Sequence, residues 1–377
     1  MKIGILTFFY SNNNYGQVLQ CYALQEFLKN LGHDVFLINY DYHKDIIKKP
    51  FIVRCFKLLN FVNLISYIKY KQHSSSVISE EQKNGRLFLD FKKKYINCYD
   101  IFNTYLDLKN RPPEANIYIV GSDQVWNFWF KDIKRHYNQI HTYFLDFGNS
   151  TVKRLSYAAS WGMETITPDY AKEITPLLQR FDYVSVREES GMELCRKCGR
   201  DDAEWVCDPT LLLNADTYRN LYKENEIHKP SKQFLLLYIL NNSCNFDLQK
   251  VYDFAISKGL DVIYVTGNGV VDKREKYYAT IPEWLWLVDN AEYVITNSFH
   301  CGIFCTIFNK RFGIIPLSDD CKEMNSRFES LFSLRGIGNR YISDKDFSVL
   351  DIDYKVEPVY PSNRFLEALN CHCQKSQ

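Results

Sequence analysis

Apolar and polar positions along this chain follow a repeating order, in which a short apolar run leads into a polar loop and then into a segment with helical spacing. The first unit consists of the apolar run 3–8, the polar loop 10–16 and the segment 17–32, whose apolar residues recur on one helix face. Gly32 stands where a helix would end, and the apolar run 34–40 follows it. This order predicts two parallel strands joined by a right-handed crossover.

The same alternation continues through the rest of the chain, with a polar segment at 214–233 between two halves. Further strands are expected at 117–120, 154–162, 183–188, 234–240, 261–267, 291–298 and 311–317. Further helices are expected at 174–182, 189–199, 246–258, 281–290, 300–309 and 359–374. We therefore predict an α/β protein with two Rossmann-like domains facing a cleft, residues 1–213 on the acceptor side and residues 214–377.

The region 44–115 interrupts the alternation and is expected to be a helix-rich insertion. Within it, residues 44–73 carry seven Lys or Arg and one Asp around apolar and aromatic stretches. Such a segment suits an anionic membrane surface, and it equally suits a core-packed helix pair with solvated lysines. No run of 18 apolar residues is free of charge, so we expect no transmembrane helix.

Charge and cysteine usage narrow the function classes. The net charge is +1, which gives no argument for nucleic-acid binding. The first residues turn polar too soon for a signal peptide, so we expect a cytoplasmic protein whose twelve cysteines are free thiols. A zinc site needs four well-placed ligands, and the pair Cys195/Cys198 is the one CxxC in the chain, so we predict no metal site.

Three loops follow expected strands and lead toward helices, at 11–16, 121–127 and 297–302. In open parallel sheets ligands bind beyond the carboxyl ends of the strands, and helix N-termini favour anions. Neither GxGxxG nor GxxxxGK[ST] occurs in these loops. The candidate binding residues that they supply are Asn14, Tyr15, Gly16, Gly121, Ser122, Trp126, Asn127, Asn297, Ser298, Cys301 and Gly302.

His300 is the candidate catalytic residue, because it lies between an expected strand and an expected helix that Ser298 is able to cap. Histidine titrates near neutral pH, which suits general acid–base catalysis. A buried structural histidine is the alternative.

Three charged residues near strand ends have open interpretations. Asp123 is either a cap of the Gly-Ser turn or a base for a sugar hydroxyl. Arg187 is either an anchor for a planar anion or a surface residue paired with a neighbouring glutamate. For Asp208, which precedes a proline, the favoured interpretation is that it only ends a strand.

Six strings in the chain resemble, in the same order, those of polysaccharide pyruvyl transferases: NNNYGQVLQCYALQEFLKNLGHDVFLINY, VGSDQVWN, SYAASWG, YVSVREESG, CDPTLL and ITNSFHCGIFCTIFNK. The resemblance covers about residues 1–320. It implies a GT-B-like fold and the transfer of pyruvate from phosphoenolpyruvate to two sugar hydroxyls, with a ketal formed and phosphate released. It implies His300 as the acid–base group and Arg187 as an anion anchor, without a cofactor.

The implied acceptor is a lipid-linked precursor of a surface or capsular polysaccharide, and the protein itself is expected at the inner face of the membrane. Some family members carry arginine two residues before the histidine, where this chain has Ser298. Backbone N–H groups near Cys301, or Arg311 or Arg327, would have to supply the missing donor. Two alternatives stay open: a nucleotide-sugar glycosyltransferase on the same scaffold, and a non-catalytic membrane-associated scaffold protein.

Overall fold

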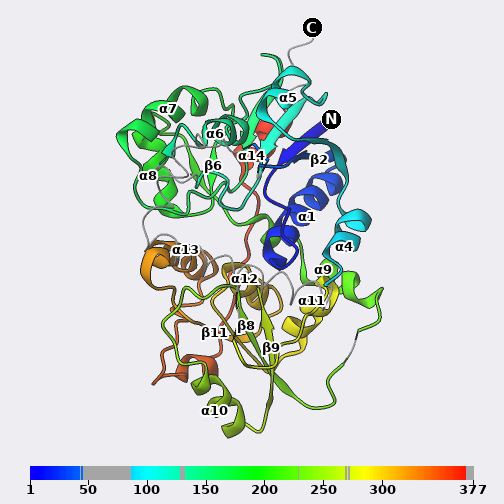
Figure 1. Cartoon of the computed structure of the whole chain (residues 1–377), viewed down its shortest axis with the longest axis vertical. Helices are drawn as coiled ribbons and strands as arrows, with labels where there is room; N and C mark the ends of the chain where they lie inside the picture. Colours follow the sequence, from blue (N-terminus) through cyan, green and yellow to red (C-terminus); the bar gives the residue numbers. More distant parts are fainter. Residues whose placement is uncertain are drawn as a thin grey trace, which may run out of the picture.

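The computed structural model describes residues 1–42, 44–45, 86–127, 132–227, 229–267, 270 and 272–370. They form two α/β domains, drawn one above the other in Figure 1. Nearly all of the basic segment 44–73 lies outside the described residues, so membrane contact through it stays a prediction. No described helix is long and apolar enough to span a membrane.

The first domain is built on a parallel sheet with the strand order β3-β2-β1-β4-β5. Its strands are β1 (Lys2–Leu6), β2 (Asp34–Tyr40), β3 (Cys98–Phe102), β4 (Ile117–Val120) and β5 (Lys153–Ser156). The short parallel pair β6 (Ser185–Val186) and β7 (Glu204–Trp205) continues it through isolated bridges from β5. The order reverses between β1 and β4, so the loops after these two strands lie at a switch point, where ligands bind in such folds.

Helices of this domain connect the parallel strands. They are α1 (Tyr15–Asn30), α4 (Phe88–Tyr95), α5 (Tyr105–Asn110), α6 (Tyr137–Tyr143), α7 (Pro168–Leu178) and α8 (Glu189–Lys197), followed by the 3₁₀-helix η2 (Pro209–Leu212). Helix α1 begins where Asn14 caps it by accepting a hydrogen bond from the Gln17 N–H. The chain thus forms the strand, loop and helix that its apolar spacing predicted.

Strand β3 was not predicted, because the region 44–115 was expected to be a helix-rich insertion. Four of its five residues are exposed, and only Phe102 is buried. As the edge strand of the sheet it lacks the alternation that marks a half-buried strand in a sequence. Its pairing with β2, a tertiary contact, decides its conformation.

The second domain has a four-stranded parallel sheet in the order β11-β10-β8-β9. Its strands are β8 (Phe234–Ile239), β9 (Asp261–Thr266), β10 (Tyr293–Thr296) and β11 (Arg311–Ile314). Its helices are α9 (Ala215–Lys223), α10 (Gln249–Ser257), α11 (Ile281–Asn290), α12 (Phe299–Ile307), η3 (Asp319–Asn325), α13 (Ser326–Arg335) and η4 (Ser348–Asp351). Every residue of β8 is buried, as expected for a central parallel strand covered on both faces.

One hydrophobic core joins the two domains, and Tyr15 at the start of α1 is its clearest link. The Tyr15 ring stacks on Trp284 of α11, with ring centroids 5.0 Å apart, and meets the edge of Tyr238 of β8. Its hydroxyl donates to the Ala279 carbonyl at 2.7 Å. We predicted that Tyr15 binds substrate, but in the structure its side chain packs between the two domains.

The last described helix, α14 (Asn363–Asn370), lies against the first domain although it follows the second in sequence (Figure 1). Phe365 packs on Tyr157 and Tyr183, and Arg364 pairs with Asp202 and Glu204. The chain therefore crosses between the domains twice, so a division at residue 214 does not describe where this helix packs.

Candidate active site

His300 lies at the strand-to-helix junction that the sequence predicted. Strand β10 ends at Thr296, and Ser298 caps α12 by accepting a hydrogen bond from the Cys301 N–H at 3.4 Å. His300 is in the first turn of α12, and only 6% of its surface is exposed. This places the imidazole at the carboxyl edge of the second sheet, facing the first domain.

The nearest charged partner of His300 is Asp208. The distance between Nε2 of His300 and Oδ2 of Asp208 is 3.4 Å. The same carboxylate oxygen accepts hydrogen bonds from Nη1 of Arg187 at 3.1 Å and from the hydroxyl of Ser122 at 2.8 Å. Four segments far apart in sequence therefore meet around one buried carboxylate.

Asp208 is the functional residue that sequence reasoning missed. Burial by itself raises the pKa of its carboxyl group, but the positive charges of His300 and Arg187 hold that pKa well below the usual range. The Asp208 carboxylate therefore stays ionised beside the imidazole of His300. The signal in the sequence was the string CDPTLL, which we interpreted as the end of a strand.

Arg187 is not the surface residue that one interpretation allowed. It is 3% exposed, and no described residue forms a hydrogen bond with its Nε or Nη2. Burial disfavours its charge, but Glu188 and Asp208 raise its pKa, so the guanidinium stays charged. Its Nε faces Oε1 of Glu188 at 3.7 Å, so the pairing with a neighbouring glutamate that this interpretation included is present. The N–H groups on Nη2 have no hydrogen-bond partner in the described chain and are suited to hold an anion.

Arg327 of α13 lies beside Arg187, with the ring of Phe299 against both. The guanidinium carbons of Arg187 and Arg327 are 4.7 Å and 5.6 Å from the centroid of this ring. Burial and the nearby charge of Arg187 lower the pKa of Arg327 to about 10, so it is still cationic at neutral pH. Among the described residues, no carboxylate forms an ion pair with Arg327, whose Nε donates to the Met324 carbonyl.

The other candidate for the missing donor, Arg311, lies elsewhere. It is exposed at the start of β11 and pairs with Asp353 at 3.1 Å. Tertiary contacts thus bring Arg327 to the residue next to His300 and leave Arg311 on the surface.

Gly16 accounts for how closely the two domains meet at His300. A Cβ atom on Gly16 would lie 2.3 Å from Cβ and Cγ of His300, closer than side chains approach one another. The imidazole therefore rests directly on the first turn of α1. We predicted Gly16 as a residue that lets a ligand approach the backbone, and in the structure it makes room for His300.

Gly16→Ala is expected to lower the turnover number about 100-fold, because a displacement of roughly 1 Å at a catalytic group has effects of that size. Helix α1 itself should tolerate the change, since alanine is favoured over glycine inside helices by about 1 kcal/mol. Steady-state kinetics together with the melting temperature test this. Lys29→Ala on the same helix is the control, and a fully active Gly16→Ala enzyme would show that His300 does not work from this position.

Asp123 forms the turn contact that the cap interpretation predicted, and its role as a base for a sugar hydroxyl stays a prediction. Its backbone has a φ of 77°, an uncommon value for a residue other than glycine. Oδ1 caps the turn by accepting from the Gln124 N–H at 2.9 Å, and Oδ2 accepts from Nε2 of Gln17 at 3.3 Å. The half-buried carboxylate is thus held between the loop after β4 and the first turn of α1.

Other predicted residues of the loop after β4 have mainly structural contacts. Gly121 packs closely on Thr7, where a Cβ atom would be 3.1 Å away. The indole N–H of Trp126 donates to the Tyr143 carbonyl, and the ring is fully buried. The amide of Asn127 donates to the Gly162 carbonyl at 3.5 Å.

The predicted residues around His300 also have internal partners. The side chain of Asn297 accepts from the Leu240 N–H at 2.7 Å and donates to the Asn241 carbonyl at 2.8 Å. These contacts join the loops after β8 and β10. Cys301 and Gly302 are buried in α12, on the core side of the helix.

No group of three or more His, Cys, Asp or Glu side chains in the described part of the chain is arranged to hold a metal ion. The nine described cysteines are free thiols, and seven of them have a raised pKa, mainly because they are buried.

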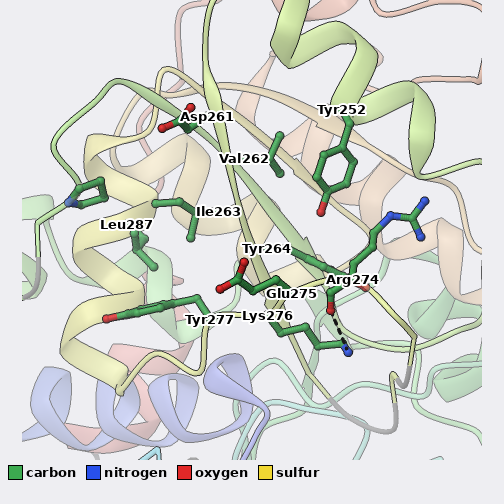
Figure 2. A pocket seen from close by; sticks show the side chains of 11 residues that line it. Tyr252, Asp261, Val262, Ile263, Tyr264, Arg274, Glu275, Lys276, Tyr277 and Leu287 are labelled. Atoms are coloured by element: carbon green, nitrogen blue, oxygen red, sulfur yellow. Dashed lines mark hydrogen bonds between the residues drawn. The ribbon is translucent and has the colours of Figure 1, made fainter.

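A pocket of about 600 Å³ lies at the open edge of the second sheet, along β9 (Figure 2). Tyr252 of α10, Leu287 of α11 and the segment 274–277 line it together with the strand. None of the residues around His300 lines this pocket. This pocket is therefore separate from the site formed by His300, Asp208 and Arg187.

The model of the family described as polysaccharide pyruvyl transferase matches residues 14–319. This chain belongs to the polysaccharide pyruvyl transferase family. The match contains His300, Asp208 and Arg187, whereas Arg327 lies beyond it. The resemblance predicted from short strings is thereby confirmed.

The likeness to a solved epimerase structure supports the two-domain fold of this pyruvyl transferase family member. The UDP-GlcNAc 2-epimerase of Methanocaldococcus jannaschii has a TM-score of 0.51 at 11% identity, over 98% of this chain and 99% of the other. A putative UDP-N-acetylglucosamine 2-epimerase of Listeria monocytogenes has a TM-score of 0.49 at 10% identity, over 100% and 98%. The predicted GT-B-like architecture is confirmed. No curated protein matched the chain.

Proposed function

We propose that this protein transfers pyruvate from phosphoenolpyruvate to two hydroxyl groups of one sugar, forming a cyclic ketal and releasing phosphate. The observation that carries the proposal is the buried set His300, Asp208 and Arg187, in a chain of the pyruvyl transferase family. It combines a protonatable group, a fixed counter-charge and free cationic donors, which this reaction requires.

The first chemical step is protonation of the methylene carbon. His300, whose Nε2 faces Asp208, gives a proton to this carbon, and the adjacent carbon becomes electrophilic. The first sugar hydroxyl attacks there, and its proton returns to His300. Arg187 and Arg327 hold the carboxylate and phosphate of the donor during this step.

The second step replaces phosphate by the other hydroxyl. The C–O bond to phosphate breaks, and phosphate leaves with the proton that His300 took from the first hydroxyl. The second hydroxyl forms the ring bond and gives up its proton, for which Asp123, held by Gln17 of α1, is the proposed base. The protons balance. The two hydroxyl groups lose two protons in total, and the new methyl group and the departing phosphate each gain one.

The proposed acceptor is a lipid-linked precursor of a surface polysaccharide, bound on the side of the first domain. The loops after β1 and β4 lie at the switch point of that sheet and border His300. The basic segment 44–73 is the proposed contact with an anionic membrane that carries such an acceptor.

Ligand-induced stabilisation tests the donor. At a phosphoenolpyruvate concentration 100 times its Kd, the free energy of unfolding should rise by about 2.7 kcal/mol, whereas UDP and GDP should have no effect. Phosphate release should then require a lipid-linked galactose- or mannose-type acceptor. Stabilisation by UDP or GDP instead of phosphoenolpyruvate would contradict the proposal and favour a glycosyltransferase.

A further inference from the structure

Lys92 of α4 is a buried lysine that the proposed mechanism does not use. Its ammonium nitrogen is 3.4, 3.3 and 3.2 Å from the carbonyl oxygens of Phe9, Tyr10 and Ser11, and 3.1 Å from Oδ1 of Asn12. In the described chain no carboxylate forms an ion pair with it, and 8% of its surface is exposed. Burying a charge without a counter-ion costs free energy, and the contacts with these four oxygens offset part of that cost.

These four oxygens belong to the loop between β1 and α1, which borders the proposed active site. The Ser11 N–H donates to Oε1 of Gln17 at 2.9 Å, and Nε2 of Gln17 donates to Asp123 at 3.3 Å. Gly16, in the same turn of α1, is the residue on which His300 rests. The path of this loop therefore sets the position of two proposed catalytic side chains.

We propose that Lys92 is a positioning residue for pyruvyl transfer, whose ammonium group acts as a built-in cation that fixes the loop 9–14 and, through Gln17 and Gly16, aligns Asp123 with His300. This inference rests on the proposed function for its kinetic consequences. The donor anion is held by Arg187 and Arg327, which do not contact this loop. Loss of Lys92 should therefore lower kcat and leave donor binding nearly unchanged.

The charge of Lys92 depends on pH in the working range. Burial lowers the pKa of Lys92 to about 8, so in the folded protein the ammonium is lost as the pH rises past that value. The titratable groups that face it are Cys21 of α1 and Cys98 of β3. Full burial raises the pKa of the Cys21 thiol well above its usual value, and partial loss of solvent around the sulfur raises the pKa of Cys98 on the exposed edge strand, so both thiols stay neutral where Lys92 titrates.

The test compares the wild-type enzyme, Lys92→Met and the control Lys93→Met, which changes an exposed lysine on the same helix. The wild type should lose activity above about pH 8. Lys92→Met should show kcat lowered about 10- to 100-fold, no such alkaline decrease, and an unchanged shift of the melting temperature by phosphoenolpyruvate. Lys93→Met should behave as the wild type.

A wild-type kcat that is constant from pH 7 to 9.5, or a folded Lys92→Met enzyme with normal kcat, would overturn the proposal. If Lys92→Met does not fold, the wild-type pH profile alone decides. Hydrogen exchange of peptides covering residues 8–17 tests the role of Lys92 in fixing the loop even if the proposed function is wrong, because this measurement needs no substrate. The exchange rate of these amides, corrected for its intrinsic pH dependence, should increase above pH 8. An unchanged rate would also contradict the proposed role of Lys92.

Discussion

Replacing His300 with glutamine is expected to lower kcat for pyruvyl transfer by about 10²- to 10⁴-fold, the usual contribution of a positioned acid–base group. Glutamine fills a similar volume beside Gly16 but cannot protonate the methylene carbon. Phosphoenolpyruvate should still bind, because Arg187 and Arg327 are retained. Single-turnover kinetics and calorimetric titration with phosphoenolpyruvate measure the two quantities separately.

His33→Gln is the matched control for this substitution, because His33 lies in the turn between α1 and β2 and has no contact with the site. It should leave kcat unchanged. A His300→Gln enzyme with more than one tenth of the wild-type kcat would contradict the role of His300. A parallel loss of phosphoenolpyruvate binding would instead indicate that His300 anchors the donor.

Replacing Arg327 with methionine is expected to weaken phosphoenolpyruvate binding by about 10- to 150-fold, since hydrogen bonds to charged groups contribute about 1.5–3 kcal/mol. Methionine keeps the apolar contact with Phe299 and removes the cation. Because Arg327 forms no ion pair with a described carboxylate, its loss leaves no buried partner charge behind. The melting temperature without ligand should therefore change little.

Arg311→Met is the control for this experiment, since Arg311 is exposed and pairs with Asp353. Its Kd for phosphoenolpyruvate should equal that of the wild type. If Arg311→Met weakens binding and Arg327→Met does not, the donor lies on a different side of α12. This comparison decides which arginine compensates for Ser298.

Arg187 is less suited to such a test although it is the more central residue. Its removal would leave the carboxylate of Asp208 buried without its partner, and breaking a buried ion pair in this way costs about 3–5 kcal/mol of stability. A loss of activity in such a variant would therefore mix folding with binding. Arg327 separates the two effects, because it forms no ion pair with a described carboxylate.

Much of the fold was predictable because the physical cause was local. Apolar runs of strand length, each followed by a loop and a helical period, specify parallel α/β units, and β8 and β10 formed as predicted. The position of His300 followed from the same pattern, since a residue just after a strand and before a helix lies at the carboxyl edge of a sheet. Strand β3 was missed because its exposed residues carry no such pattern.

The sequence by itself determined the α/β class, the order of the elements outside residues 44–115, the family and the placement of His300 and Arg187 at strand ends. Tertiary structure alone decided that Asp208 is the counter-charge of both, that Arg327 rather than Arg311 approaches the site, and that Tyr15 joins the domains. The reason is distance along the chain. Periodicity reports which face of one element is buried, whereas an ion pair between residues 208 and 300 depends on how two domains pack, which no local pattern encodes.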